Sequence, residues 1–120
     1  MKLLFVDCCI SQRGTASRTR ALADAFLTAF TASHPDWTVE TVDVTALELV
    51  PFTVEMLDER DALASVEAWD APVFAQALQL RGADAVVVAA PYWDLSYPAA
   101  LRTYMEYISA NGLAYHYEPD

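Results

Sequence analysis

Two short apolar runs, at residues 3–6 and 84–90, are the strongest pattern in the chain. Neither run alternates between apolar and polar residues, which is typical of strands that are covered by helices on both faces. The first run extends at most to Ile10. A third segment, residues 37–44, mixes β-branched with polar residues and predicts a strand at the edge of the sheet.

The segments between these strands have a helical period. In residues 17–33, Leu22, Phe26 and Phe30 recur every four positions, which predicts a helix that packs this apolar face on the sheet. Residues 55–79 predict one helix, or two with a break near 70–72. Residues 98–110 predict a last helix, since proline is well placed in a first turn and the following Asn111 and Gly112 are typical of a helix end.

The predicted order is therefore strand, helix, strand, helix, strand, helix. This alternation predicts a single α/β domain over residues 1–120, with a parallel sheet and helices on both of its faces. In open sheets of this kind, ligands bind at the carboxyl ends of the strands. The loops that begin after the two apolar strands are therefore the candidate site.

Composition narrows the possible partners. The chain has 120 residues, of which 55% are hydrophobic, and a formal net charge of −10, which argues against a broad surface for nucleic acid or anionic membranes. It has no apolar segment long enough to span a membrane, and Asp7 interrupts the first run too early for a signal peptide, so we expect a cytoplasmic protein. Adjacent cysteines, Cys8 and Cys9, point to opposite faces of a strand and predict neither a disulfide nor a metal site.

The first loop carries the features of an anion site. Arg13, Arg18 and Arg20 lie within eight positions of one another, next to the start of a helix, whose first N–H groups have no partner within the helix. Hydroxyl donors and one arginine would complete a phosphate site, formed by Ser11, Ser17 and Thr19 with Arg13 or Arg18. The alternative is that Ser17 or Thr15 only caps the helix. Neither a GK[ST] ending nor GxGxxG is present, which favours a monophosphate.

The second loop, residues 91–97, brings three aromatic residues to the same edge of the sheet: Tyr92, Trp93 and Tyr97. A flat aromatic ligand whose phosphate lies on the first loop could stack here. The alternative is that these side chains pack on the following helix or at a subunit interface.

These segments together resemble the flavodoxin-like family of FMN-dependent NADH-azoreductases and NAD(P)H:quinone oxidoreductases. The resemblance rests on S-x-R-G-x-x-S-x-T-R-x-L-A over residues 11–23, on A-D before the strand at 84–90, and on P-Y-W-D-L-S-x-P-A over residues 91–99. It implies a parallel sheet in the order 2-1-3, a homodimer, and FMN reduced by NADH or NADPH before a quinone or azo compound takes the electrons. It implies phosphate contacts for Ser11, Ser17, Arg18 and Thr19, and ring contacts along Pro91, Tyr92, Trp93, Asp94 and Leu95. No catalytic acid, base or metal is required.

Two departures from the family pattern stand out. Asp94 replaces a common amide, and a carboxylate that faced the ring would disfavour the anionic reduced flavin. The family also continues through two further strands, whereas this sequence ends after the third, and the uninterrupted valines and alanines of strand 84–90 lack the charges or prolines that protect a sheet edge. We therefore expect a truncated family member, a rearranged fold, or another chain that covers this strand.

The sequence leaves three alternatives to an oxidoreductase. An FMN-binding electron carrier would share the phosphate loop, and a truncated remnant would have no activity. A cysteine-dependent phosphatase would need an arginine six positions after its cysteine, but Gly14 and Thr15 stand six positions after Cys8 and Cys9. The sequence therefore disfavours the phosphatase.

Overall fold

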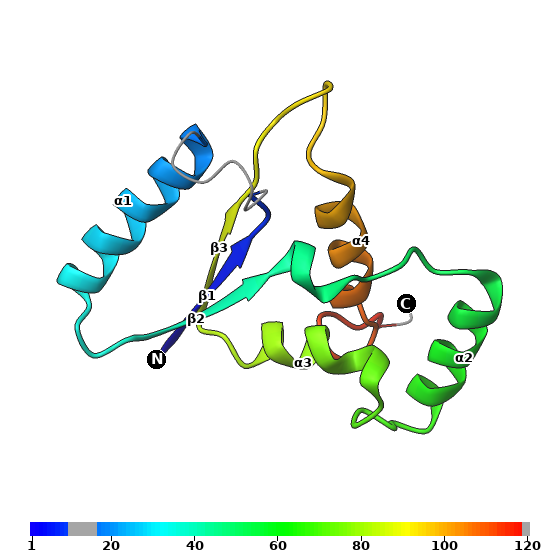
Figure 1. Cartoon of the computed structure of the whole chain (residues 1–120). Coiled ribbons are helices and arrows are strands. Elements are labelled where there is room, and N and C mark those ends of the chain that lie inside the picture. The colour runs from blue at the N-terminus through cyan, green and yellow to red at the C-terminus, as the bar shows by residue number, and fades with distance from the viewer. Residues whose placement is uncertain (10–16, 119–120) are drawn as a thin grey trace.

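The computed structural model of the chain describes residues 1–9 and 17–118 (Figure 1). Strands and helices alternate as predicted: β1 (Lys2–Asp7), α1 (Arg18–Ser33), β2 (Thr38–Asp43), α2 (Val54–Ser65), α3 (Ala75–Arg81), β3 (Ala85–Ala89) and α4 (Ala99–Ile108). Two 3₁₀ turns, η2 (Val44–Leu47) and η3 (Pro72–Phe74), complete the order. The predicted break near 70–72 is confirmed, because η3 and a short connection separate α2 from α3.

The three strands form one parallel sheet in the order β2-β1-β3. This confirms the predicted 2-1-3 order and the edge position of β2. In the central strand, Leu4 is aligned with Glu40 of β2 and with Val86 of β3. Leu3, Leu4, Phe5 and Val6 are all buried, so the unbroken apolar run of β1 correctly predicted a strand covered on both sides.

Helices lie on both faces of the sheet, with α1 on one side and α3 and α4 on the other (Figure 1). On the side of α4, Leu4 of β1 and Cys8, which directly follows β1, pack with Leu101 and Tyr104 of α4. On the side of α1, Cys9 packs with other buried side chains, namely Phe5, Ala23 and Ala89. The two cysteines are thus free thiols on opposite faces, as predicted.

The apolar face of α1 differs from the prediction. Leu22 and Phe26 are 74% and 43% exposed, and the sheet is instead contacted by Ala23 and Leu27. Leu22 and Phe26 form one row along the helix, and Ala23 and Leu27 form the row next to it. The small side chain of Ala23 lets the helix backbone approach the sheet closely. Phe30 packs beside the sheet against Trp37, with ring centroids 5.4 Å apart.

The outer side of β3 is also more open than predicted. Val86 and Val88 are 42% and 48% exposed, so the expectation of a strand buried on both faces was wrong, whereas its predicted position at the edge is confirmed. The reason is that Leu101 and Tyr104 of α4 pack against residues of β1 rather than over these valines. In the described part of the chain, β3 therefore presents an apolar edge.

Candidate functional site

The carboxyl ends of β1 and β3 lie side by side, as the alternating order predicted. Asp7, the last residue of β1, is aligned with Ala89, the last residue of β3. The N–H of Cys8 donates to the carbonyl of Ala89 at 2.9 Å. The connection to α1 and the loop to α4 both begin at this point (Figure 1), so they can contribute to one site.

The first turn of α1 supplies the described half of the predicted phosphate site. Ser17 is the N-cap, and its Oγ accepts a hydrogen bond from the N–H of Arg20 at 3.2 Å. Capping uses one acceptor position of the hydroxyl, and a serine hydroxyl can donate its proton as well as accept. Arg18 is exposed and Thr19 is half-buried in the same turn. Ser11, Arg13 and Thr15 lie outside the described residues.

An ion pair ties this turn to the end of β1. The Asp7 carboxylate is buried, and its Oδ2 lies 2.6 Å from Nη1 of Arg20. Its Oδ1 accepts the N–H of Cys9 at 2.9 Å. The sequence predicted no role for either residue in the site. One feature of the sequence could have indicated the ion pair, namely the carboxylate at the end of an apolar strand. A negative charge that is buried there requires a cationic partner.

The two thiols are poor nucleophiles. Burial, with a smaller contribution from the Asp7 carboxylate, raises the pKa of Cys8 to about 12. Burial and Asp7 also raise the pKa of Cys9. Both cysteines therefore stay protonated at neutral pH, which gives no support to a thiolate mechanism.

The loop after β3 contains a tight, exposed turn. Trp93 and Ser96 exchange two backbone hydrogen bonds of 2.9 Å, and the two residues between them, Asp94 and Leu95, have φ angles of 50° and 65°. Positive φ at both central positions is the pattern of a type I′ turn, which asparagine and glycine usually occupy. Leu95 is 89% exposed.

Two of the three aromatic residues of this loop are exposed. Tyr92 and Tyr97 are exposed, and they contact each other edge to face with ring centroids 5.7 Å apart. Pro91 and Trp93 are half-buried, and Asp94 is exposed. An exposed aromatic surface is thus available at the carboxyl end of the sheet, where α1 begins.

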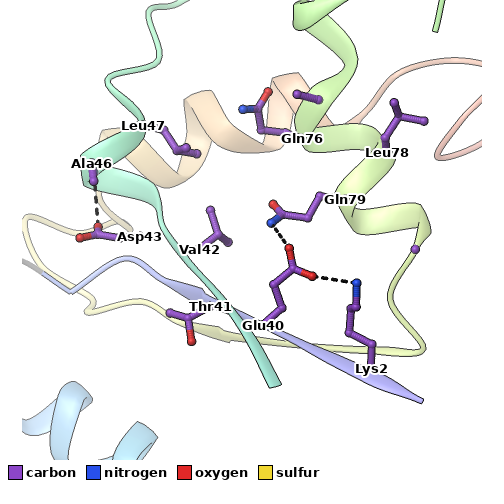
Figure 2. A pocket seen from close by; sticks show the side chains of 12 residues that line it. Lys2, Glu40, Thr41, Val42, Asp43, Ala46, Leu47, Gln76, Leu78 and Gln79 are labelled. Carbon is purple, nitrogen blue, oxygen red and sulfur yellow. Dashed lines mark hydrogen bonds and ion pairs between the residues drawn. The ribbon is translucent and has the colours of Figure 1, made fainter. Parts of the chain in front are cut away.

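A hollow of about 670 Å³ lies elsewhere, along β2 and α3 (Figure 2). Its main polar groups already satisfy one another. Oε2 of Glu40 lies 2.9 Å from Nζ of Lys2, and Nε2 of Gln79 donates to Oε1 of Glu40 at 2.6 Å. The hydrogen bond from Gln79 and, next to it, the contact with Lys2 lower the pKa of Glu40. We therefore do not assign the ligand site to this hollow.

The described residues offer neither a cluster of metal ligands nor a membrane-spanning helix. They contain no group of three or more histidine, cysteine, aspartate or glutamate side chains placed to hold a metal ion. None of the helices in the described part is long and apolar enough to cross a membrane.

Similar proteins are known. Residues 1–120 match the family described as "Flavodoxin-like fold". The FMN-dependent NADH:quinone oxidoreductase of Clostridium beijerinckii is 32% identical over 116 residues, which are 97% of this chain and 58% of that protein. FMN-dependent NADH:quinone oxidoreductase 2 of Clostridium perfringens is 28% identical over 116 residues, which again cover 97% of this chain and 58% of that protein.

Solved structures agree with these relatives. The azoreductase from Bacillus anthracis str. Sterne superposes with a TM-score of 0.84 at 27% sequence identity, covering 99% of this chain and 60% of that one. The azoreductase AzrA gives the same TM-score and coverage at 29% identity. The chain thus spans somewhat more than half the length of the proteins that it resembles.

Proposed function

Because the chain belongs to the flavodoxin-like fold family, we propose that it carries the FMN site of an NAD(P)H-dependent oxidoreductase that reduces quinones or azo compounds. One observation carries this proposal. The Ser17 hydroxyl, at the start of α1, and the exposed aromatic loop after β3 both lie at the carboxyl end of the sheet. The proteins that are similar to this chain include FMN-dependent NADH:quinone oxidoreductases and azoreductases, and this similarity supports the proposed use of the site.

The described residues fit FMN at its phosphate end. Ser17 and Thr19 offer hydroxyl donors, the first turn of α1 offers amides, and Arg18 offers an exposed positive charge. We include Ser11 and Arg13 in this proposal on their sequence positions alone. The contacts of Arg20 with Asp7 offset the buried negative charge that would otherwise repel a phosphate.

The flavin ring would lie on the second loop. Pro91, Tyr92, Trp93, Asp94 and Leu95 would contact it, and the exposed aromatic surface suits stacking. When bound, FMN would supply the hydride and electron transfer. The chain would hold the phosphate, orient the ring and shield part of it from water.

The test is binding and turnover with the purified chain. We expect a yellow protein, or a colourless one that takes up FMN with a shifted flavin absorbance spectrum. NADH and NADPH oxidation would then be followed with a quinone and with an azo dye. FMN binding without nicotinamide oxidation would favour an electron carrier instead. A chain that shows no titratable FMN binding would refute the flavin assignment.

We further propose that a polypeptide pairs with the open edge of β3, either a second copy of the chain or another chain. The exposed Val86 and Val88, with no charge or proline in the strand, support this proposal. Val88→Lys is expected to weaken self-association at least tenfold, because it places a charge beside the pairing edge. Sedimentation at several protein concentrations measures this effect.

Val39 offers a matched control on the opposite edge of the sheet, because it is a comparably exposed valine of β2. Val39→Lys is expected to leave self-association unchanged. Equal effects of both substitutions would argue against pairing at β3. A wild-type chain that remains monomeric at all concentrations would rule out a second copy as the partner.

A further inference from the structure

Asp7 is the one charged side chain that is buried in the described part of the chain, with 6% of its surface exposed. A buried carboxylate is costly unless it is paired and hydrogen-bonded. It also stands at the carboxyl end of β1, beside the proposed phosphate site, where an unpaired negative charge would repel the ligand. Its position therefore calls for a functional explanation as well as a structural one.

Each oxygen of Asp7 holds a different segment. Oδ1 accepts the N–H of Cys9, the second residue after β1, at 2.9 Å. Oδ2 contacts Nη1 of Arg20, in the first turn of α1, at 2.6 Å. The carboxylate thus fixes both the point where the chain leaves the strand and the point where the helix begins.

Arg20 connects Asp7 to Ser17. Its side chain reaches Asp7, while its backbone N–H donates to Oγ of Ser17 at 3.2 Å. Its Nε also donates to Oδ1 of Asp24 at 3.1 Å, which orients the guanidinium from the helix side. The contact between Arg20 and Asp7 therefore links the Ser17 cap to the end of β1, in addition to the hydrogen bond between the Ser17 hydroxyl and the Cys9 thiol.

We propose that Asp7 and Arg20 are positioning residues for the phosphate end of the site, an inference that rests on the proposed function. Arg20 acts through Asp7 rather than as a phosphate ligand, because its described contacts go to two carboxylates. Its removal exposes the site to the uncompensated charge of Asp7 and releases the first turn of α1.

The experiment compares FMN with riboflavin, which lacks the phosphate, as ligands of three proteins. Arg20→Gln is expected to weaken FMN binding about tenfold to a hundredfold and riboflavin binding less than about threefold, because only FMN meets the uncompensated charge. The double variant Asp7→Asn/Arg20→Gln removes that charge. It is expected to recover at least half of the FMN affinity that Arg20→Gln loses, measured on a logarithmic scale.

Glu40 provides the matched control. It also pairs with a cation, at 2.9 Å from Nζ of Lys2, and accepts a hydrogen bond from Gln79 at 2.6 Å, but it lies on β2 away from the proposed site. Glu40→Gln is expected to leave both ligand affinities unchanged. A double variant as weak as Arg20→Gln would overturn the inference and identify Arg20 as a direct ligand. Equal losses for FMN and riboflavin would overturn it in favour of general damage to the fold.

A second measurement needs no flavin. In the unliganded protein, Asp7→Ala is expected to speed amide hydrogen exchange at Cys9, whose N–H it holds, and at Ala21, whose N–H donates to the carbonyl of Ser17 at 3.1 Å. Glu40→Gln is expected to leave both amides unchanged. Unchanged exchange in Asp7→Ala would overturn the positioning role. A wild-type protein that binds no FMN would refute the proposed function, while the exchange result would still decide whether Asp7 positions this turn.

Discussion

Replacing Ser17 and Thr19 together by alanine is expected to weaken FMN binding more than a hundredfold. Both residues lie at the start of α1, where Ser17 accepts the N–H of Arg20, and each hydroxyl has one proton that it can donate to an anion. A hydrogen bond to a charged group contributes about 1.5–3 kcal/mol, so the loss of two corresponds to a factor of roughly 10²–10⁴ in affinity. Titration of the flavin-free protein with FMN, followed by flavin fluorescence, measures this effect.

The same helix offers a matched control. Thr28→Ala/Ser33→Ala also removes one threonine and one serine hydroxyl from α1, but at exposed positions beyond the first turn. This variant is expected to bind FMN like the wild type. Because Ser17→Ala also removes the cap of α1, at a cost of about 1 kcal/mol, urea unfolding must show that the first variant is folded at the assay temperature. A folded double variant with wild-type FMN affinity would contradict the proposed phosphate site.

The sequence was sufficient to predict the order and type of the main elements. Uninterrupted apolar residues predicted β1 and β3, mixed β-branched and polar residues predicted the edge strand β2, and helical spacing predicted α1 and α4. These patterns are reliable because they reflect local geometry: a strand alternates its side chains between two faces, whereas a helix repeats every 3.6 residues. The parallel 2-1-3 order then followed from the alternation of elements and from the family resemblance.

Burial was harder to predict, because it depends on neighbours that a local pattern does not specify. Leu22 and Phe26 form the larger apolar row of α1, yet the sheet contacts Ala23 and Leu27. Periodicity indicates roughly which side of a helix is apolar, but it does not decide between two adjacent rows. In the same way, the valines of β3 are suited to a covered strand, and Val86 and Val88 are nonetheless exposed because α4 packs over β1.

The sequence predicted where the two candidate loops lie, but not all of the contacts between their residues. The rule that ligands bind at the carboxyl ends of parallel strands located both loops. The pairing of Asp7 with Arg20 could not be predicted, because several arginines lie in the same short segment and only the folded arrangement brings one of them to the end of β1. The left-handed conformations of Asp94 and Leu95 were also missed, since neither residue is typical of a type I′ turn.

Gly112→Ala is expected to lower the free energy of unfolding by about 2–4 kcal/mol. Gly112 has a φ angle of +94°, where an alanine is strained. An added Cβ would also lie 2.9 Å from Cη2 and 3.1 Å from Cζ2 of Trp69. Trp69 cannot move away freely, because its ring packs against the buried Phe74, with centroids 5.0 Å apart. Urea unfolding followed by tryptophan fluorescence measures the loss.

Gly82 is the matched control, because it has none of these constraints. It follows α3 with a φ angle of −77°, and the nearest atoms to an added Cβ would be backbone oxygens at 3.6 Å, an ordinary van der Waals distance. Gly82→Ala is therefore expected to be neutral or to stabilise the chain by up to about 1 kcal/mol, because it reduces the entropy of the unfolded state. Equal losses of stability in the two variants would show that neither the positive φ of Gly112 nor its contact with Trp69 limits substitution there. A selective loss in Gly112→Ala would instead show that the segment after α4 is held against Trp69 by this close approach.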